Sequence, residues 1–579
     1  MKLRAHAQAR GTVCFTGGLG AAIALGLAGA GPVAAQGAAS IAMQECASFQ
    51  GLSVSPATIG LPTQGATVLV AERLAAQPRT VAENGEIILP LPAYCRLAGE
   101  IASLDEQAPE IQFNVNLPLI WNGRAMQSGG GGLGGAINTA PGQKASGRWD
   151  PQPVTEEYPL TRGWVTFGGD EGHRRGDISF IYNDEALRNW AGDALKKIHD
   201  VALALIERAY GQSPEYVYFN GESAGGKEAL YVAQRYAADY DGIMAVSPVL
   251  SWTYIHLADN YIRSRLVDGW LDADAIKLIA DATRAACDAD DGLADGILAR
   301  YLDCRMNPQD LACPGGGAGE GCLSTAQIRS LNAIREPWVM SVPLAYGVNR
   351  FAGFGITGDE DGPENQYAFY MVGTEPPAYP LPAGRGFQPG LGAIMNFGAV
   401  WVRHVMAQDE TFEPYDFYPP AYADRIQYIS GLFDSTNPDL SRLRERGGKL
   451  MILHHSADNA VSTPMVAEYY RSVVAEMGQM AADDVLRLYI GPGGAHNGTG
   501  VAQADALNPL IAWVERGEAP PVEMPIYDID PTTHETRRGM VACAYPYYAR
   551  YDGSGDPNAA SSFSCTARRD PLAYDPNAR

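Results

Sequence analysis

The sequence is short of positive charge. Its 579 residues include 43 lysines and arginines against 66 aspartates and glutamates, which gives a formal net charge of −23 at pH 7. A protein with this balance repels nucleic-acid phosphates and anionic lipid headgroups. We therefore expect no nucleic-acid partner and no membrane anchoring, and an anionic substrate would need a local arginine.

Long apolar runs are also missing beyond the N-terminal segment, so no transmembrane helix is expected there. Near the start, basic residues precede an apolar run at residues 21–30, and small residues stand at positions 33 and 35. This arrangement is typical of a cleavable secretory signal. We therefore predict a signal peptide over residues 1–35 and a secreted or periplasmic protein.

The cysteines include no Cys-x-x-Cys pair and no nearby histidine, which argues against a zinc site. Cys14 lies in the expected signal, and the other eight form an even set, as expected for disulfides in an oxidising compartment. Eight cysteines allow about a hundred pairings. The most economical pairing joins sequence neighbours: Cys46 with Cys95, Cys287 with Cys304, Cys313 with Cys322, and Cys543 with Cys565.

One stretch, Tyr218–Gly226, organises the chain, because strand-like aromatic residues run into a Gly-x-Ser-x-Gly turn around Ser223. The glycines at 221 and 225 let a strand and a helix pass closely, so that the serine hydroxyl projects from a strained turn. Residues 227–236 then have helical spacing and no helix breaker. The motif alone could mark an ordinary turn, but this strand-turn-helix context favours a catalytic nucleophile.

A glycine cluster at 129–135 follows Trp121–Ser128, about ninety residues before the serine. Backbone N–H groups of such a loop can stabilise a developing oxyanion. A flexible loop is the plainer alternative. Phosphate binding is discounted because no Gly-Lys-Ser/Thr follows.

Strand and helix patterns alternate around the serine, with strands expected at 163–169 and 241–246 and a helix at 190–210. This alternation predicts an α/β fold with a parallel sheet. From residue 252 to 434 the pattern breaks into a Pro-, Gly- and aromatic-rich region that reads as an inserted lid. We expect the core to comprise residues 36–251 and 435–579.

An acidic residue and a histidine follow two later strand-like runs. The strand-like run 448–457 ends at Asp458, and the run 486–490 leads into a glycine-rich loop that contains His496. The order Ser223, Asp458, His496 is that of the α/β-hydrolase catalytic triad. The remaining candidate histidines, His173, His454 and His455, are expected to be structural.

An acidic loop at 287–297 packs four carboxylates and two glycines into eleven residues, which favours Ca²⁺ binding by hard oxygen ligands. It is not an EF-hand, because the twelfth position counted from Asp288 is Ala299 and supplies no glutamate. A solvated acidic turn is the alternative.

With these residues in view, the sequence resembles the tannase and feruloyl esterase family, which also contains mono(2-hydroxyethyl) terephthalate hydrolase. The resemblance covers most of the mature chain. It rests on Trp121–Arg124, Tyr218–Trp252, the acidic loop, Met451–Tyr470, Trp513–Pro520 and Ala549–Asp556.

The resemblance implies an α/β-hydrolase fold with a lid and a triad of Ser223, Asp458 and His496. It implies an oxyanion hole from the N–H groups of Gly130 and Ala224, and the same four disulfides. It also implies structural Ca²⁺ held by the side chains of Asp288, Asp291 and Asp295 and the carbonyls of Leu293 and Ile297.

One departure from the family concerns a cysteine pair that flanks the serine and the histidine. Here these positions are Glu222 and Asn497. We expect their side chains to face each other and to form a hydrogen bond in place of the disulfide.

The sequence therefore predicts a secreted carboxylic-ester hydrolase for esters of aromatic acids, feruloyl, galloyl or similar. Alternatives are a polyester-oligomer hydrolase, another ester or peptide hydrolase, or a non-catalytic binding module on a hydrolase scaffold. Lid aromatics could line the substrate pocket (Trp252, Tyr254, Tyr367, Phe369, Phe397 and Trp401). Beside Trp401, Arg403 could pair with a substrate carboxylate or with an acid such as Glu413.

Overall fold

The structure is a computed structural model that describes residues 46–139, 152–355, 357–362, 366–382, 384 and 388–568. The signal peptide expected at 1–35 lies outside these residues. None of the helices in the described ranges is long and apolar enough to cross a membrane.

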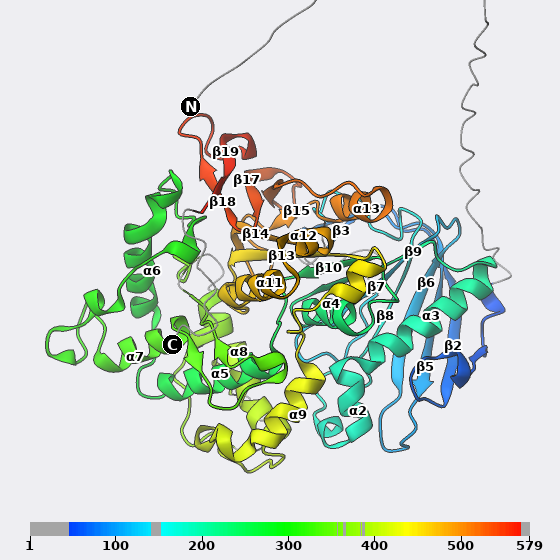
Figure 1. Ribbon diagram of the computed structural model, residues 1–579, viewed down its shortest axis with the longest axis horizontal. Coiled ribbons are helices and arrows are strands. Elements are labelled where there is room, and N and C mark those ends of the chain that lie inside the picture. Colours follow the sequence, from blue (N-terminus) through cyan, green and yellow to red (C-terminus); the bar gives the residue numbers. More distant parts are fainter. Residues whose placement is uncertain are drawn as a thin grey trace, which may run out of the picture. The chain divides into compact units, whose positions relative to one another are not determined.

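A single large sheet runs through the fold (Figure 1), and thirteen strands of the described chain join it in the order β1-β2-β5-β6-β8-β7-β9-β10-β13-β14-β17-β16-β15. Its centre is parallel, from β8 to β14. These central strands are largely buried on both faces, which explains their continuous apolar runs. Their bounds are β7 (Arg124–Ser128), β8 (Val165–Gly169), β9 (Tyr216–Glu222), β10 (Gly242–Val246), β13 (Lys449–Ala457) and β14 (Leu486–Ala495).

Antiparallel strands extend the sheet on both sides. Before the parallel centre come β1 (Ser53–Val54), β2 (Gly65–Leu74), β5 (Tyr94–Ala102) and β6 (Ile111–Pro118), and after it come β17 (Thr536–Ala544), β16 (Glu523–Ile529) and β15 (Gln503–Ala504). Three two-stranded ribbons stand apart: β3 (Thr80–Val81) with β4 (Ile87–Ile88), β11 (Trp338–Val339) with β12 (Arg350–Phe351), and β18 (Tyr547–Tyr551) with β19 (Phe563–Ala567).

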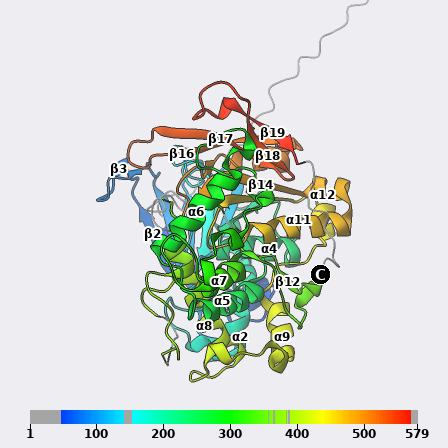
Figure 2. The same ribbon diagram turned by 90° about the vertical axis from the view of Figure 1, so that its left-hand side faces the viewer.

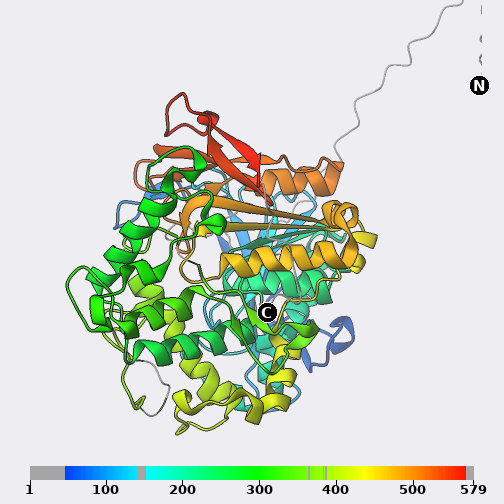
Figure 3. The ribbon, with the colours of Figure 1, turned by 60° about the vertical axis from the view of Figure 1, so that its left-hand side comes forward.

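Helices cover both faces of the sheet, as the alternating strand residues require. On one face Phe219 and Ile243 share a core with α4, whereas on the other face Tyr218 and Met244 share a core with Trp513 of α13. Accordingly α13 and α11 lie on opposite sides of the sheet (Figure 3). Outside residues 252–434 lie the helices α2 (Asp184–Arg188), α3 (Ala194–Tyr210), α4 (Ala224–Arg235), α10 (Ser441–Glu445), α11 (Thr463–Met477), α12 (Gln479–Val485) and α13 (Leu507–Arg516).

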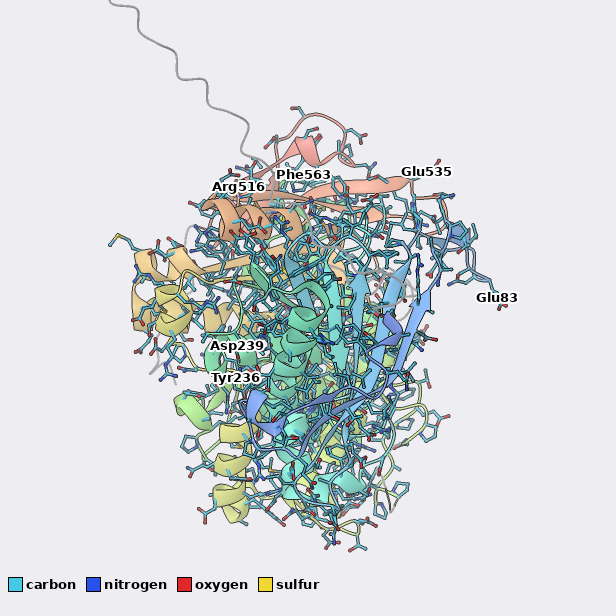
Figure 4. The ribbon with its side chains drawn as sticks, turned by 90° about the vertical axis from the view of Figure 1, so that its right-hand side faces the viewer. Glu83, Tyr236, Asp239, Arg516, Glu535 and Phe563 are labelled. Carbon is cyan, nitrogen blue, oxygen red and sulfur yellow. A yellow bond between two sulfur atoms is a disulfide. The ribbon has the colours of Figure 1, made fainter. Side chains whose placement is uncertain are left out.

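The C-terminal elements gather at one end of the sheet. In Figure 4, Arg516 at the end of α13, Glu535 just before β17 and Phe563 at the start of β19 all lie along the upper margin. The residues of these strands pack with α13 in one core, so the last part of the chain belongs to the sheet face that α13 covers.

Between β10 and β13 the chain leaves the sheet for a group of helices that lie together at one side (Figure 2). They are α5 (Trp252–Leu266), α6 (Ala273–Cys287), α7 (Thr325–Arg335), α8 (Ala393–Val400) and α9 (Ala423–Phe433). Trp252 and Trp401 from this region share one hydrophobic core with Leu230 of α4. The division of the chain into a core and a lid at 252–434 remains a prediction.

Disulfides join the cysteines as sequence neighbours. The pairs are Cys46–Cys95, Cys287–Cys304, Cys313–Cys322 and Cys543–Cys565. These are the four pairs expected from the sequence.

Two expected elements differ in extent. The strand expected at 486–490 continues to Ala495, so His496 follows the strand directly and not a glycine loop. The helix expected from residue 190 begins with a π-helical turn at Asn189–Asp193, in which Gly192 has φ 155° and interrupts the helical backbone before α3.

Candidate active site

Ser223 lies at the sharp turn between β9 and α4. Its φ of 56° and ψ of −116° are unusual for a residue with a side chain and indicate local strain. A Cβ added to Gly221 would overlap the carbonyl of Gly225, and one added to Gly225 would lie 2.6 Å from the Gly130 oxygen. The turn therefore needs glycine at both positions, as the motif predicted.

The parallel register brings the candidate residues to one edge of the sheet. β7 and β9 are adjacent parallel strands, so the glycine loop after Ser128 and the turn at Ser223 leave the sheet side by side. β13 and β14 are also adjacent and parallel, which delivers Asp458 and His496 to the same edge. Ligand sites of open α/β sheets lie at this carboxyl edge.

Ser223, His496 and Asp458 form a continuous chain of contacts. His496 Nε2 lies 3.1 Å from Ser223 Oγ, and His496 Nδ1 lies 2.8 Å from Asp458 Oδ2. The other carboxylate oxygen of Asp458 accepts the N–H groups of Ala460 and Val461 at 2.9 and 2.8 Å. Such an arrangement can pass the serine proton to the imidazole and hold the imidazole in one orientation.

The Asp458 carboxylate is 1% exposed. Burial alone would raise its pKa, but the charge and the hydrogen bond of His496 lower the pKa to about 2. The group is therefore a carboxylate at all pH values at which the histidine can act as a base.

A cavity of about 1060 Å³ opens beside these residues. Ser223, His496 and the glycine loop contribute to its wall, and six aromatic residues line it: Phe180, Trp190, Trp252, Phe369, Tyr370 and Phe397. The Tyr370 ring meets the His496 ring edge to face, with 5.1 Å between centroids. A mostly apolar wall with a few polar groups is typical of a small-molecule site.

The sequence identified part of this wall. Trp252, Phe369 and Phe397 line the cavity as expected, whereas the expected Tyr254 and Tyr367 do not. Phe180 and Trp190 were missed, because they precede α3 and no local pattern shows that this segment turns toward the serine.

The predicted substrate contact of Trp401 and Arg403 needs correction. Both side chains are 1% exposed and neither lines the cavity. The Arg403 guanidinium donates to the carbonyl oxygens of Phe412, Pro382 and Gly384 at 2.8 to 3.1 Å. This arginine therefore binds the backbone of the lid region, and we propose no substrate contact for it.

Two further polar residues reach the cavity without any sequence signal. His256 Nδ1 lies 3.2 Å from Asp259 Oδ2, and both residues line the wall. Burial lowers the pKa of His256 to about 3 and raises that of Asp259 well above its usual range. Burial therefore disfavours the charged form of each group.

Two of the three histidines that the sequence assigned to structural roles, His173 and His454, have buried partners. His173 Nε2 lies 2.9 Å from the Leu133 carbonyl oxygen, and its ring stacks on Phe180. His454 Nε2 lies 2.8 Å from the Thr463 hydroxyl.

The two amides expected in the oxyanion hole have different surroundings. Ala224 is the first residue of α4, where backbone N–H groups have no partner within the helix. The Gly130 N–H instead donates to Glu228 Oε2 at 2.8 Å. The amide of Gly130 is thus held by a carboxylate in this structure.

Three of the four carboxylates of the acidic loop accept hydrogen bonds from its backbone. Asp288 accepts the Gly296 N–H at 3.0 Å, Asp291 accepts the Ala299 N–H at 2.8 Å, and Asp295 is paired with Arg538. In the described residues no three His, Cys, Asp or Glu side chains already converge as a metal site. The hard oxygen chemistry of the loop nevertheless fits Ca²⁺.

Glu222 and Asn497 flank the serine and the histidine. Glu222 lines the cavity, and Asn497 Oδ1 accepts the N–H and the hydroxyl of Thr499 at 3.1 and 2.6 Å. The direct hydrogen bond between the two side chains stays a prediction.

Comparisons with known proteins identify the family of the chain. Residues 95–566 match the family model described as tannase and feruloyl esterase. An uncharacterized esterase of Agrobacterium fabrum is 32% identical over 543 residues, covering 90% of this chain and 92% of the relative. The mono(2-hydroxyethyl) terephthalate hydrolase of Piscinibacter sakaiensis is 29% identical over 530 residues, covering 82% and 85%.

A solved structure has the same α/β-hydrolase fold. Feruloyl esterase B from Aspergillus oryzae superposes with a TM-score of 0.70 at 21% identity, over 90% of this chain and 100% of the other. The chain therefore belongs to the tannase and feruloyl esterase family of carboxylic-ester hydrolases.

Proposed function

We propose that this chain is a secreted serine esterase that hydrolyses esters of aromatic acids, such as feruloyl or galloyl esters. The observation that carries the proposal is the contact chain from Ser223 Oγ through His496 to Asp458 beside an aromatic cavity. The resemblance to feruloyl esterases supports the substrate class.

In the first half of the reaction, His496 Nε2 takes the Ser223 proton while the serine oxygen attacks the ester carbonyl. The tetrahedral intermediate then expels the alcohol, which takes the proton from His496 and leaves an acyl-enzyme. In the second half, His496 deprotonates water, which attacks the acyl carbonyl; the bond to Ser223 Oγ then breaks, the serine oxygen takes the proton back from His496, and the acid is released. Asp458 keeps the imidazole oriented and stabilises its charged form in both halves.

The oxyanion of each intermediate would meet backbone N–H groups. Ala224 offers its N–H at the N-terminus of α4, where the helix dipole also favours negative charge. Gly130 is the second donor that the family resemblance indicates, and its N–H would have to exchange Glu228 for the oxyanion.

Six aromatic rings around the cavity support an aromatic acyl group as the bound part of the substrate. Stacked and edge-to-face ring pairs are worth about 0.5–1.5 kcal/mol each beyond the area that they bury. At about 1060 Å³ the cavity exceeds the volume of one aromatic acid, which leaves room for part of the alcohol.

A fluorophosphonate ester should label Ser223, and the Ser223→Ala variant should neither be labelled nor hydrolyse methyl ferulate. Ser247→Ala is a matched control, because Ser247 is a fully buried serine directly after β10, next to β9 in the sheet. A label found on another residue, or full activity of Ser223→Ala, would refute the assignment. Hydrolysis of 4-nitrophenyl acetate by the wild type separates an enzyme from a binding module on a hydrolase scaffold.

A panel of methyl gallate, methyl ferulate, a terephthalate monoester and hydroxybutyrate oligomers tests the substrate class. Under the proposal, the aromatic esters have kcat/KM values well above that of the aliphatic oligomers. The reverse order would favour the polyester-oligomer alternative.

We further propose that the acidic loop holds a structural Ca²⁺ through Asp288, Asp291 and Asp295 and the carbonyls of Leu293 and Ile297. The proposal rests on the family resemblance and on the density of hard oxygen atoms between the cysteines of one disulfide. A bound ion would screen the mutual repulsion of these carboxylates.

Chelation should then lower the melting temperature, because a ligand at a hundredfold excess over its Kd stabilises the native state by about 2.7 kcal/mol. Elemental analysis of the purified protein gives the second readout. An unchanged melting curve after prolonged chelation, together with no calcium in the protein, would count against the site.

Export is the remaining part of the proposal. It rests on the predicted signal at 1–35 and on four disulfides, which persist in oxidising compartments. Cell fractionation followed by N-terminal sequencing should find a protein that starts near residue 36 outside the cytoplasm.

A further inference from the structure

Two buried carboxyl groups lie directly beneath the glycine loop that lines the cavity. Glu171 follows β8 and is 4% exposed, and Glu228 lies in α4 and is 2% exposed. The two side chains are hydrogen-bonded to each other, and Glu228 Oε2 accepts the Gly130 N–H at 2.8 Å. Buried carboxyl pairs are costly unless they share a proton or have a cation nearby.

The surroundings of the two carboxyl groups favour the proton on Glu171. Burial raises its pKa well above the usual range, and the charge of Glu228 raises it further. Its Oε1 has no hydrogen-bond partner among the described residues. Burial also raises the pKa of Glu228, but the charge of Lys227 and the Gly130 N–H oppose that shift. The Gly130 N–H and the nearby Lys227 charge thus favour Glu228 as the charged member of the pair, with Glu171 as the donor.

Lys227 supplies the balancing positive charge. It is 3% exposed, and its Nζ donates to the Ala191 carbonyl oxygen at 2.6 Å. The same Nζ lies over the rings of Tyr231 and Phe433, 5.0 and 5.3 Å from their centroids. These contacts hold the cation among the aromatic rings, and the Glu228 carboxylate accepts the Gly130 N–H.

The glycines of the loop allow the carboxyl groups to approach its backbone. A Cβ on Gly129 would lie 2.7 Å from Glu228 Oε2, and a Cβ on Gly130 or Gly134 would overlap the Glu171 carboxyl group. Gly131, in contrast, is exposed and lines the cavity, and a Cβ there would meet no atom within 4 Å. The loop thus has one side against the carboxyl pair and another side facing the cavity.

We infer that Glu171 and Glu228 form a carboxyl clamp that holds the glycine loop against the nucleophile turn before the ester binds, and that the Gly130 N–H passes from Glu228 to the oxyanion during hydrolysis. Glu228 stands four residues after Ala224 in α4, one helical turn below it. The helix that starts at the nucleophile therefore also holds the glycine loop beside the nucleophile turn. This inference rests on the proposed function, and it makes Glu228 and Glu171 positioning residues.

The geometry implies an order among the variants. Glu171→Gln imitates the protonated acid and can still donate to Glu228, so kcat should stay within about threefold of the wild type. Glu228→Gln keeps an acceptor oxygen but loses the charge, which weakens its bond to Gly130. Glu228→Ala removes the acceptor and should lower kcat by about tenfold or more with KM nearly unchanged, because the loop loses its position and not its contact surface.

The test measures kcat and KM with methyl ferulate for the three variants, normalised to the fraction of Ser223 that a fluorophosphonate labels. This normalisation corrects for unfolded protein. It also distinguishes a failure of the proposed function, because in that case the fluorophosphonate would label the wild-type protein at a residue other than Ser223. Glu360→Gln is a matched control, since Glu360 is a 1% exposed carboxyl group that accepts the Thr357 N–H away from the cavity. Hydrogen–deuterium exchange of residues 126–139 reports on the loop directly.

Support requires the order wild type ≈ Glu171→Gln > Glu228→Gln > Glu228→Ala in kcat, with faster exchange of the loop in the two Glu228 variants only. Equal losses in Glu171→Gln and Glu228→Gln would overturn the assigned proton, and kcat within twofold of the wild type in Glu228→Ala would overturn the clamp. Should Glu228→Ala fail to fold, the near-isosteric Gln pair and its exchange data decide the question.

Discussion

Replacing Asp458 by asparagine should reverse the tautomer of His496. One oxygen of Asp458 accepts two backbone N–H groups, from Ala460 and Val461, and the other lies 2.8 Å from His496 Nδ1. The asparagine oxygen will occupy the position that faces the two N–H groups, so its NH2 must face the histidine. His496 Nδ1 then accepts, Nε2 carries the proton, and the imidazole cannot take the proton of Ser223.

The size of the effect follows from the alternative orientation of the amide. Flipping asparagine restores the productive tautomer but sets its NH2 against two buried N–H groups. At about 1–3 kcal/mol for each unsatisfied donor, the flip costs roughly 2–6 kcal/mol. The productive fraction therefore falls by about 30-fold to 10⁴-fold, and the tautomer reversal in a Ser-His-Asp triad has an effect of about 10⁴ on kcat.

The assay is kcat on methyl ferulate, normalised to folded protein by circular dichroism. Asp434→Asn is the matched control, because Asp434 is fully buried and accepts the Thr253 N–H at 2.8 Å but has no contact with the triad. Its kcat should remain within a few-fold of the wild type. A loss below tenfold in a folded Asp458→Asn protein would refute the tautomer argument.

Two further predictions concern stability. Burial raises the pKa of Asp434 to about 7, against hydrogen bonds from Thr253 and Ser251 that lower it. Because the folded-state pKa is raised, this group's contribution to the free energy of unfolding is fully present below about pH 4 and is lost as the pH rises through 7. Asparagine does not titrate, so the free energy of unfolding of Asp434→Asn, measured with urea, should rise relative to that of the wild type by up to about 4 kcal/mol between pH 4 and pH 8. A difference between the two proteins that stays the same at both pH values would contradict the burial argument. The Cys46–Cys95 disulfide spans 49 residues and Cys313–Cys322 spans 9, so chain entropy predicts that removing the first by paired Cys→Ser substitution costs about 4 kcal/mol and the second about 2.5. Equal losses in denaturant midpoint would refute the entropic account for this chain.

The contacting residues Ser223, His496 and Asp458 could be predicted from the sequence because each has a local signature. The turn at Ser223 needs glycines within two residues, and Asp458 and His496 each follow an apolar strand. The order of the three residues along the chain then completes the pattern. The disulfides were equally accessible, since each joins sequence neighbours.

The parts that could not be predicted depend on contacts between distant segments. Glu228 looks like an ordinary helical glutamate in the sequence, and nothing nearby shows that Glu171 and the Gly130 amide meet it in the interior. Arg403 stands beside a tryptophan, as a substrate-binding arginine could, but the carbonyls that surround it come from residues 9 to 21 positions away. Local patterns predict where a backbone turns, whereas partners of buried charges are set by tertiary packing.

The two outermost strands of the sheet bear on self-association. An open sheet has an unpaired row of backbone N–H and C=O groups at each edge, and such rows can recruit another chain. In this sheet β1 and β15 have only two residues each (Ser53–Val54 and Gln503–Ala504). Neither edge offers a run long enough to template a further strand, so the edges of this thirteen-stranded sheet do not favour pairing with a second chain. Lengthening β1 with β-branched residues should turn that edge into a dimerisation surface.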